Sequence, residues 1–500
     1  MENVMAIDIG TGFSKAAIIF NGIKEPMLLI PNNMPMGMKS VAYIDKDGQI
    51  KVMPSGVPIN CTAVRNVKTR LYEKTISVHV GDKEHNIEPG KIYGEIAKEL
   101  IIVANKMLVD NGKQPVYKVV VTYPAAFIHS ENPRLTTKNV EVIRESIEAL
   151  TIDGNKIEVI KMLPEPVAAA YESICYERNV KENPITDKSY NIAVFDLGHG
   201  TFDVAVVTST DQNDQPFDVV AQGGDKEIGG RVFDDKIYDS ICKKLGHPYG
   251  VNLSVSEQEE LHYTKAVDIK HSLSNPSTTN AYDNIFNQAS GQYLEIGMTK
   301  DEFEALIQTD LNITLEKTVE VIQRAESKGI RINEIVLTGG SSQINAIEKL
   351  LTAMFKDKNI TVRVFRPEHA VVFGAARYAF NLEKAPVTQH AEYSYGIFMN
   401  DNSRVKFVID SNDEVPKKSR EFEMSPDDCS TEIRVCRSKN TICTADSLDY
   451  SDCNEIWRFR FDTDKSKPHK FVINLDDTHR VTVECEYPTG RKITKTKYDD

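Results

Sequence analysis

The sequence has no segment suited to export or to membrane insertion. Residues 1–8 lack the basic start and apolar stretch of a signal peptide. No apolar run along the chain reaches the roughly 18 residues that a membrane helix needs. These absences predict a protein that works in the cytoplasm and has no membrane partner.

Basic clusters and paired cysteines are missing as well. The 500 residues carry a formal net charge of −13, and their lysines and arginines are scattered among acids, so we expect no nucleic-acid partner. None of the eight cysteines forms a Cys-x-x-Cys pair, and no histidine is spaced for a zinc finger. We expect reduced, mostly buried thiols. Five of them fall in the last quarter of the chain: Cys429, Cys436, Cys443, Cys453 and Cys485.

What the chain does contain is an internal repeat within residues 4–380. Residues 4–20 and 191–207 each read as an apolar strand that ends in an aspartate, a glycine-rich turn and a second apolar strand. Asp8 and Asp196 interrupt the apolar pattern at the same point of the two copies. Since 41% of the residues are hydrophobic and the length allows roughly two to four domains, the repeat predicts two related globular lobes.

A glycine-rich turn beside an aspartate suits a phosphate group. Glycines let successive backbone N–H groups approach an anion closely. An aspartate would repel the phosphate oxygens unless a divalent cation lay between them, and magnesium is commonly held by one or two carboxylates, waters and phosphates. One such hairpin is more often a plain tight turn. Two copies, each opening its own α/β segment, predict two lobes that hold the phosphates of a nucleotide from opposite sides.

Three further segments fit an α/β chain. Residues 334–344 read as a buried strand, a Gly-Gly turn and a helix, with Ser341 or Ser342 as its expected N-cap. Residues 139–150 have the apolar spacing of an amphipathic helix. Pro166 suits a first helical turn and places Glu165 at a loop–helix junction, where functional carboxylates are frequent. The alternative is that Glu165 only complements the helix dipole.

In this order the elements resemble the ATPase superfamily of actin and the heat-shock protein 70 chaperones, and the heat-shock protein 70 branch fits best. The resemblance spans nearly all of residues 4–380. Four motifs carry it, at residues 165–170 (EPVAAA), 196–204 (DLGHGTFDV), 224–230 (GDKEIGG) and 367–376 (PEHAVVFGAA).

The resemblance implies an α/β fold: a two-lobed, actin-like ATPase with duplicated lobes, followed by a small β-sandwich. Short alternating strands in the last hundred residues agree with the sandwich. The predicted domains are lobe I at 1–185 with a return helix at 369–382, lobe II at 186–368, a linker at 383–392 and a β-sandwich resembling a peptide-binding domain at 393–500.

The resemblance also implies roles for individual residues. Asp8 and Asp196 would hold magnesium, largely through its waters. Lys68 matches the family lysine that orients a water against the γ-phosphate, and Glu165, Thr201 and Asp203 would complete the catalytic network. The residues expected to line the phosphates are Gly10, Thr11, Gly12, Phe13, Gly198, His199, Gly200 and Thr201. Those expected around the rest of the nucleotide are Gly229, Gly230, Lys270, His271, Ser274, Gly339, Gly340, Ser341, Gln343 and Glu368.

Several positions depart from the family pattern. His199 stands where a third glycine is usual, and Phe13 replaces a tyrosine whose hydroxyl helps to hold a monovalent cation such as K⁺. His271 and Gln343 stand where two arginines usually sandwich the adenine, and Val267 stands where a ribose-binding glutamate is expected. Because two guanidinium faces are lost, we expect ATP binding that is weaker than the family norm.

The segment after the ATPase lobes also departs from the family. The family linker is acidic and leucine-rich, whereas residues 385–390 are neither, which puts signalling between the domains in question. We expect no helical lid after the β-domain, and Thr431 and Glu432 lie near the expected peptide pocket, so peptide binding should be fast and weak. We interpret four charged residues as solvated strand faces: Asp427, Asp428, Arg434 and Lys439.

The leading prediction is an ATPase with a weak intrinsic rate that acts as a chaperone and binds unfolded or extended polypeptide through its β-domain. Its cofactors would be ATP or ADP, magnesium and the potassium of the family. A J-domain co-chaperone and a nucleotide exchange factor are the further partners that the resemblance implies. Alternatives are a nucleotide-switched protein for one dedicated partner, an actin-like filament-forming ATPase and a small-molecule kinase, which fold alone does not separate.

Overall fold

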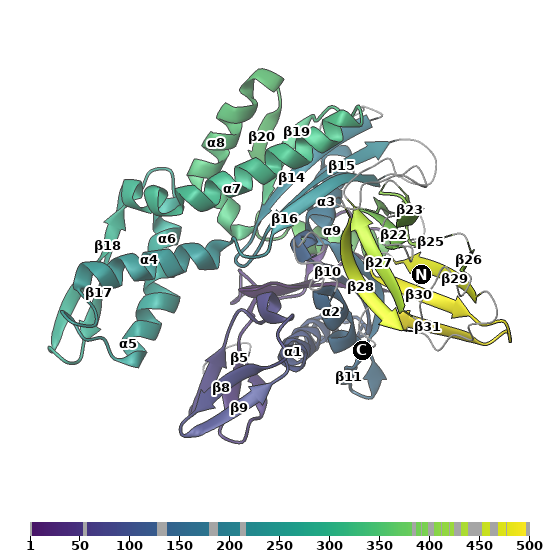
Figure 1. Ribbon diagram of the computed structural model, residues 1–500. Coiled ribbons are helices and arrows are strands. Elements are labelled where there is room, and N and C mark those ends of the chain that lie inside the picture. The colour runs from purple at the N-terminus through teal and green to yellow at the C-terminus, as the bar shows by residue number, and fades with distance from the viewer. Residues whose placement is uncertain are drawn as a thin grey trace.

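The chain forms two α/β lobes followed by a β-domain (Figure 1). The structure is a computed structural model, and it describes residues 3–53, 58–127, 138–179, 189–210, 217–382, 387–391, 393–398, 405–411, 413–419, 421–424, 432–438, 453–460, 469–476 and 478–496. We call residues 3–179 lobe I, residues 189–364 lobe II and residues 393–496 the β-domain. None of the helices in the described ranges is long and apolar enough to cross a membrane.

The first repeat forms the centre of the six-stranded sheet of lobe I. Strand β1 (Met5–Ile9) pairs with β2 (Phe13–Ile18) in an antiparallel hairpin and with β10 (Lys118–Tyr123) in parallel. These strands are apolar almost throughout because helices cover both faces of the sheet. The other strands of this sheet are β3 (Met27–Leu28), β4 (Met38–Lys39) and β13 (Glu158–Pro164).

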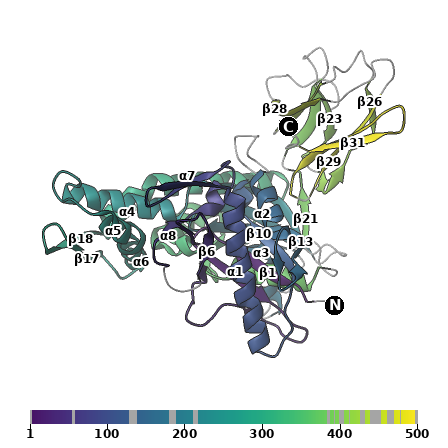
Figure 2. The same cartoon turned by 90° about the horizontal axis from the view of Figure 1, so that it is seen from below.

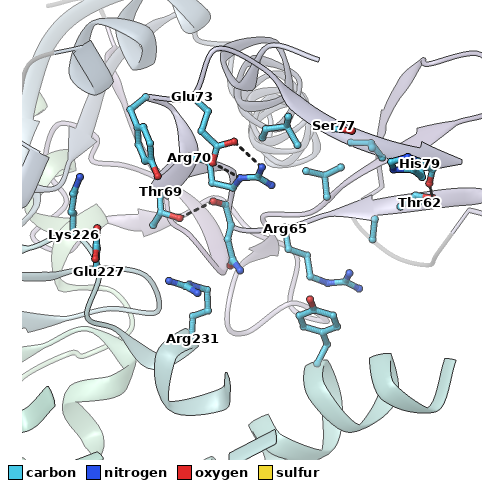
Figure 3. A pocket seen from close by; sticks show the side chains of 17 residues that line it. Thr62, Arg65, Thr69, Arg70, Glu73, Ser77, His79, Lys226, Glu227 and Arg231 are labelled. Atoms are coloured by element: carbon cyan, nitrogen blue, oxygen red, sulfur yellow. Dashed lines mark hydrogen bonds and ion pairs between the residues drawn. The ribbon is translucent and has the colours of Figure 1, made fainter. Parts of the chain in front are cut away.

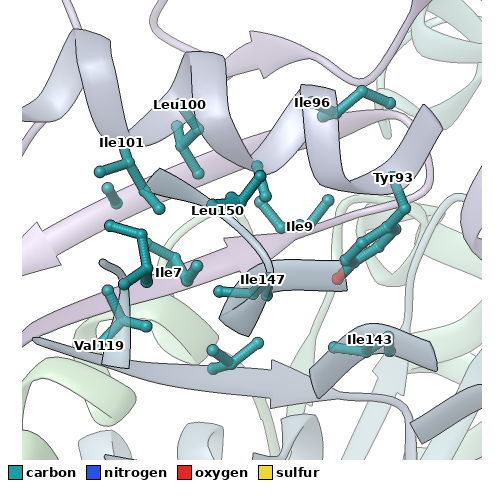
Figure 4. Close-up of a cluster of buried hydrophobic side chains, with 14 of the residues drawn as sticks. Ile7, Ile9, Tyr93, Ile96, Leu100, Ile101, Val119, Ile143, Ile147 and Leu150 are labelled. Atoms are coloured by element: carbon teal, nitrogen blue, oxygen red, sulfur yellow. The ribbon is translucent and has the colours of Figure 1, made fainter. Parts of the chain in front are cut away.

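Two helices cover one face of this sheet (Figure 4). Ile96 and Leu100 on α1 (Pro89–Asp110) and Ile147 on α2 (Lys138–Glu148) are buried in one cluster with Ile7 of β1. The predicted amphipathic helix at 139–150 is therefore present as α2. The smaller elements of lobe I are β5 (Ala42–Asp45), β6 (Ile50–Val52), β7 (Cys61–Val64), η1 (Val67–Arg70), β8 (Ile76–Val80), β9 (Lys83–Ile87), η2 (Ala125–Phe127), β11 (Thr151–Ile152) and β12 (Asn155–Lys156).

The second repeat has the same place in lobe II. Strand β14 (Ser189–Leu197) pairs with β15 (Phe202–Thr210) in a hairpin and with β19 (Glu334–Thr338) in parallel, as β1 does with β2 and β10. The predicted duplicated α/β fold is thus confirmed. The seven-stranded sheet runs β20 (Thr361–Val364), β19, β14, β15, β16 (Phe217–Asp225), β21 (Val387–His390) and β24 (Glu414–Val415).

Lobe II carries a helical extension and a turn that closes on the sheet. The expected N-cap at Ser341 or Ser342 is wrong, because both lie in a 3-10 turn and α8 begins only after Ile344, without a side-chain cap. Ser342 instead accepts a hydrogen bond from the Leu197 N–H (3.1 Å), which ties this turn to the end of β14. The elements are α4 (Gly230–Leu245), α5 (Val255–Glu260), the π-helix η4 (Leu261–Lys265), α6 (Ala266–Ser274), β17 (Asn280–Asn287), β18 (Gln292–Thr299), α7 (Lys300–Ser327), η5 (Gly340–Gln343), α8 (Asn345–Phe355) and η6 (Lys356–Lys358).

Helices α3 (Glu165–Asn179) and α9 (Ala370–Phe380) pack against each other between the two sheets (Figure 1). Their buried side chains meet Ala6 from the first sheet and Val336 from the second in one cluster. The contact is close, since a Cβ atom added at Gly374 would overlap the main-chain oxygen of Ala168.

Two sheets form the β-domain, with the apolar residues of alternating strands between them. One sheet is β23 (Val405–Ile409), β22 (Ser394–Phe398), β27 (Glu432–Ser438) and β28 (Asn454–Arg460). The other is β25 (Lys417–Lys418), β29 (His469–Leu475), β30 (Val481–Glu486) and β31 (Lys492–Thr496), with β26 (Phe422–Met424) beside β29.

The C-terminal cysteines and charges follow the predictions in part. Cys436, Cys453 and Cys485 are buried, as predicted, and Cys429 and Cys443 lie outside the described residues. The solvated-face interpretation is wrong for Arg434, which pairs with Glu455 (2.7 Å) and stacks 4.5 Å over the ring of Phe398. Asp427, Asp428, Thr431 and Lys439, and the side chain of Glu432, lie outside the described part.

The predicted linker contains a strand. Residues Val387–His390 form β21, which pairs in parallel with β16 of lobe II and antiparallel with β24 of the next segment (Figure 2). His390 Nε2 lies 2.7 Å from an oxygen of Asp218 on β16. Arg480 of the β-domain lies 3.3 Å from Glu141 on α2, so the β-domain contacts lobe I as well. The domain boundaries themselves stay a prediction.

Replacing Gly374 by alanine tests the packing between α3 and α9. The added methyl group would overlap the Ala168 oxygen, so α9 has to move away. We expect the free energy of unfolding to fall by about 3 kcal/mol, as in an overpacked core. Gly329→Ala is the control, because its methyl group meets no described atom within 4 Å and the change costs only about 1 kcal/mol for the positive φ. Equal losses in urea denaturation would contradict the close packing.

Candidate functional site

The tips of the two glycine-rich hairpins face each other across a cavity of about 420 Å³ between the lobes. This volume lies in the range of roughly 300–1,000 Å³ that is typical of small-molecule sites. Most of the predicted site residues line it: Asp8, Gly10, Thr11, Gly12, Phe13, Lys68, Glu165, Asp196, Gly198, His199, Gly200, Thr201, Lys270, His271, Ser274, Gly339, Gly340, Ser341, Gln343 and Glu368.

Three predicted residues lie behind the wall of this cavity rather than in it. Asp203 is buried on β15, where it accepts hydrogen bonds from the Ala126 N–H (2.6 Å) and the Thr201 hydroxyl (3.0 Å). Gly230 donates its N–H to the Gly198 oxygen (3.0 Å), and Gly229 packs against the main chain of the hairpin tip. These residues support the hairpin from outside.

The two tips touch each other through residues without bulky side chains. A Cβ atom at Gly200 would overlap the side chain of Thr11, and one at Gly12 would lie 3.1 Å from the ring of His199. A side chain at position 200 would push the lobes apart, and one at position 12 would require the His199 ring to shift. Because these positions carry no Cβ atom, an anion between the tips could approach their main chain closely.

Carboxylates converge beside the tips from four different elements. Asp8 ends β1 and accepts a hydrogen bond from the Thr122 hydroxyl (2.9 Å), while Asp196 ends β14. Glu165 begins α3 and pairs with Lys68 of the η1 turn. With Asp203 behind them, these groups place more negative than positive charge at this end of the cavity.

Burial and mutual repulsion shift the pKa values of these acidic residues. Burial, followed by the nearby Glu165 and Asp8, raises the pKa of Asp196 to about 8. Burial likewise raises the pKa of Asp203 well above its usual range, with Glu165 and Asp196 adding to the effect. Burial by itself would lower the pKa of Lys68, but Glu165, Asp8 and Asp203 together raise it, so Lys68 stays charged.

These residues fit a magnesium nucleotide. Among the described residues, no three His, Cys, Asp or Glu side chains lie close enough to hold a metal ion by themselves. Magnesium does not need such a cluster, because it takes phosphate oxygens and waters together with one or two carboxylates. A divalent cation near Asp8 and Asp196 would offset the charge that raises the pKa of Asp196, and the glycine tips leave room for phosphates.

The other end of the cavity is formed by α6 and the turn after β19. Lys270 donates to Asp234 (2.7 Å) and to the Gly230 oxygen (3.2 Å). Gln343 donates to Glu368 (2.7 Å), so these two side chains are held together at the rim. Where two arginines were the family expectation, the cavity has the amide of Gln343, bonded to the Glu368 carboxylate, and the imidazole of His271.

The structure adds four lining residues that sequence reasoning missed, Lys15, Met36, Pro367 and Val371. A signal for Lys15 was present, because it pairs with Asp8 across the first hairpin as Asp203 pairs with Asp196 across the second. The two repeats thus place a lysine and an aspartate at equivalent positions. Lys15 lies 3.9 Å from Glu368.

A second cavity, of about 700 Å³, opens on the other side of the η1 turn (Figure 3). Lobe I and lobe II meet here through two contacts between a cation and an aromatic ring. Arg65 lies 4.2 Å over the ring of Tyr263, and Lys226 lies 5.1 Å from the ring centre of Tyr72. Each lobe supplies one cation and one ring, so both contacts hold the two lobes against each other.

Comparison with known proteins agrees with this geometry. A model of the Hsp70 protein family matches residues 59–468. The chain belongs to the Hsp70 family. It is similar to the chaperone protein DnaK of Carsonella ruddii, with 26% identity over 87% of this chain and 73% of that protein. DnaK of Thermosipho africanus is 28% identical over 89% and 72%, and a heat shock protein of Pyricularia oryzae is 31% identical over 58% and 43%.

Hsp70 membership carries a chaperone function at the level of the family, whose members are ATPases that bind ATP or ADP with magnesium. The cavity between the lobes of this Hsp70 protein holds the hairpin motifs that carry the resemblance. This chain differs from the usual Hsp70 pattern at five positions: Phe13, His199, Val267, His271 and Gln343.

Asp196→Asn tests the crowding of acids. The folded pKa of about 8 is raised above the usual value, so ionised Asp196 costs stability that grows as pH rises from about 4 to 8. The asparagine should raise the melting temperature of the nucleotide-free protein at pH 8 by about 2 °C or more, and much less at pH 4. It should also remove most of the further rise that magnesium with ADP causes. A lower melting temperature at pH 8 would contradict the assignment.

Proposed function

We propose that this protein is an ATP-hydrolysing chaperone whose β-domain binds unfolded or extended polypeptide. One observation carries the proposal: two glycine-rich hairpins from duplicated lobes face each other beside Asp8, Asp196 and the Lys68–Glu165 pair. Family membership supports the chaperone part. We further propose that it works in the cytoplasm, without nucleic-acid or membrane partners, and with a J-domain co-chaperone and a nucleotide exchange factor.

The end of the cavity at the two hairpin tips, which we call the phosphate end, would hold the phosphates and magnesium of the nucleotide. Asp8 and Asp196 would bind magnesium largely through its waters, and the N–H groups of both tips would bind the phosphates. When bound, magnesium would supply charge that stabilises the transferred phosphoryl group. Because phosphoryl transfer depends mainly on positioning and electrostatics, the residues need not form a covalent intermediate.

Lys68 and Glu165 would position the attacking water. Lys68 stays charged in this buried place because of the acids around it, and Glu165 fixes its ammonium group. A buried positive charge next to the transferred group stabilises charge in the transition state far more than an exposed one does. Thr201, held by Asp203, would complete the polar wall behind the phosphates.

The end of the cavity formed by α6 and the turn after β19, which we call the base end, would bind adenosine weakly. The amide of Gln343, the carboxylate of Glu368 and the imidazole of His271 cannot supply the stacking and cation–π attraction of two guanidinium groups. Phe13 offers no hydroxyl for a potassium ion, so any dependence of the rate on potassium should be small. We expect rapid exchange of nucleotide from the weak binding of adenosine and from the missing hydroxyl at Phe13.

Strand β21 docks on β16 of lobe II, and this docked segment supports coupling between the nucleotide and polypeptide sites. Its pairing with β16 uses backbone hydrogen bonds, which need neither acidic residues nor leucines. Strand β16 also pairs with β15, whose first residues adjoin the phosphate tip. A change at the tip therefore has a short continuous route to the segment that precedes the β-domain.

Lys68→Ala should lower the rate of ATP hydrolysis at least about tenfold while leaving the fold intact, since positioned charge is lost from the transition state. The measurement is phosphate release in single turnover, with circular dichroism as the check on folding. Lys74→Ala is the matched control, because Lys74 is exposed and does not line the cavity. An unchanged rate in Lys68→Ala would remove the catalytic role of Lys68.

Anisotropy of a fluorescent unfolded peptide, measured with magnesium and either ATP or ADP, tests the chaperone proposal directly. We expect binding in both states, with faster release in ATP because the docked segment links the sites. If no peptide binds while ATP is still hydrolysed, the β-domain serves one dedicated partner and the chaperone proposal fails.

Arg480→Glu tests the contact between the β-domain and lobe I. The change replaces an attraction to Glu141 by a repulsion, so the acceleration of peptide release by ATP should fall by about threefold. The double variant Glu141→Arg with Arg480→Glu should restore it. Lys492→Glu is the control, because Lys492 pairs with Glu486 inside the β-domain. An equal loss in the control and no rescue in the double variant would contradict the contact.

A further inference from the structure

His199 places an imidazole inside the phosphate end of the cavity. Its backbone is held in place, since its oxygen accepts the Arg231 N–H (2.7 Å) and the neighbouring Gly198 bonds to Thr201 and to Gly230. The side chain of His199 therefore lies between the two tips. It extends from lobe II to lobe I, where it packs against Gly12.

The ring nitrogens of His199 have no hydrogen-bond partner among the described residues. The carboxylate of Asp234 is the nearest acid, but its Oδ2 lies 3.9 Å from Nδ1, which is too far for a hydrogen bond. The same Asp234 oxygen already accepts a hydrogen bond from Lys270 Nζ at 2.7 Å. The His199 side chain is about one-third exposed, 34%, and it lines the cavity, so its polar edge is open to a ligand there.

Positive charges surround the ring from two helices. Burial and, after it, the charges of Lys270 and Arg231 lower the pKa of His199 to about 3, while Asp235 opposes them and His271 has a small effect in the same direction as the cations. The ring is therefore neutral in the nucleotide-free protein at ordinary pH. A phosphate in this place would reverse the balance, because a nearby negative charge favours the charged imidazole.

We propose that His199 is a phosphate-binding residue specific to this chain, whose ring takes up a proton from solvent when a nucleotide binds and donates a charge-assisted hydrogen bond to the phosphates. The proposal rests on the proposed function, since it needs a nucleotide in the cavity. Binding would then be linked to protonation of one group. The affinity gained from it is present below the pKa of His199 in the complex and is lost as pH rises through that value.

Isothermal titration of the full chain with magnesium and ADP tests this link. Titrations at pH 6.5 in two buffers of different ionisation enthalpy give the number of protons taken up, and dissociation constants at pH 6 and pH 8 give the affinity change. We expect the wild type to take up close to one proton more than His199→Gly. Between pH 6 and 8 the wild-type dissociation constant should rise about tenfold more than that of His199→Gly.

Two further variants make the result specific. His199→Gln keeps a neutral donor of similar reach, so it should lose the extra proton and the extra pH dependence. His271→Gln removes the other imidazole of the cavity, at the base end, and should keep the extra proton whatever its effect on affinity.

The outcomes separate this proposal from the proposed function. Equal proton counts for the wild type and both His199 variants, with ADP still bound, would overturn the role of His199 alone. Tighter, pH-independent binding by His199→Gly would also overturn it, since the ring would then only obstruct the phosphates. No binding of ADP by the folded wild type would overturn the proposed function as well.

Discussion

The packing of α3 against α9 between the two sheets determines how the lobes face each other. Gly374 lies so close to the Ala168 oxygen that no side chain fits between the helices. Glu172 is fully buried in the same layer and is held by Arg377 (2.5 Å) and Arg366 (2.7 Å). A buried carboxylate without its partners would cost several kcal/mol, so this arrangement has little freedom to shift.

That constraint has a direct consequence for the site. Helix α3 begins at Glu165, and the main chain before α9 carries Glu368, so the layer that joins the lobes also supplies acids at both ends of the cavity. The hairpin tips then meet within contact distance, and the acids crowd behind them. Burial of Asp196, together with the nearby Glu165 and Asp8, accounts for its raised pKa.

The β-domain is joined to the lobes by interactions of a different kind. Strand β21 adds to the edge of the lobe II sheet through its backbone, and the side-chain contacts include His390 with Asp218 and Arg480 with Glu141. Edge pairing of a short strand is readily broken and remade, unlike a packed core.

Much of the site could be predicted because its pattern is local. The aspartate, the glycine tip and the second strand of each hairpin lie within about ten residues, and the chemistry of phosphate binding explains their order. The repeat also allowed the duplicated fold and the meeting of Asp8 with Asp196 to be foreseen. Lys15 was missed although its place in the first hairpin matches that of Asp203 in the second.

Other features were decided only by the tertiary structure. The direction of the His199 ring depends on Arg231 and Gly230 holding the tip from behind, and these contacts come from a helix later in the chain. The docking of β21 has almost no sequence signature, because backbone hydrogen bonds accept nearly any side chain. By itself the sequence determined which residues could bind phosphate and metal, since that follows from residue type and short spacing. The tertiary structure decided which of them share one cavity, because that depends on the packing of elements far apart in the chain.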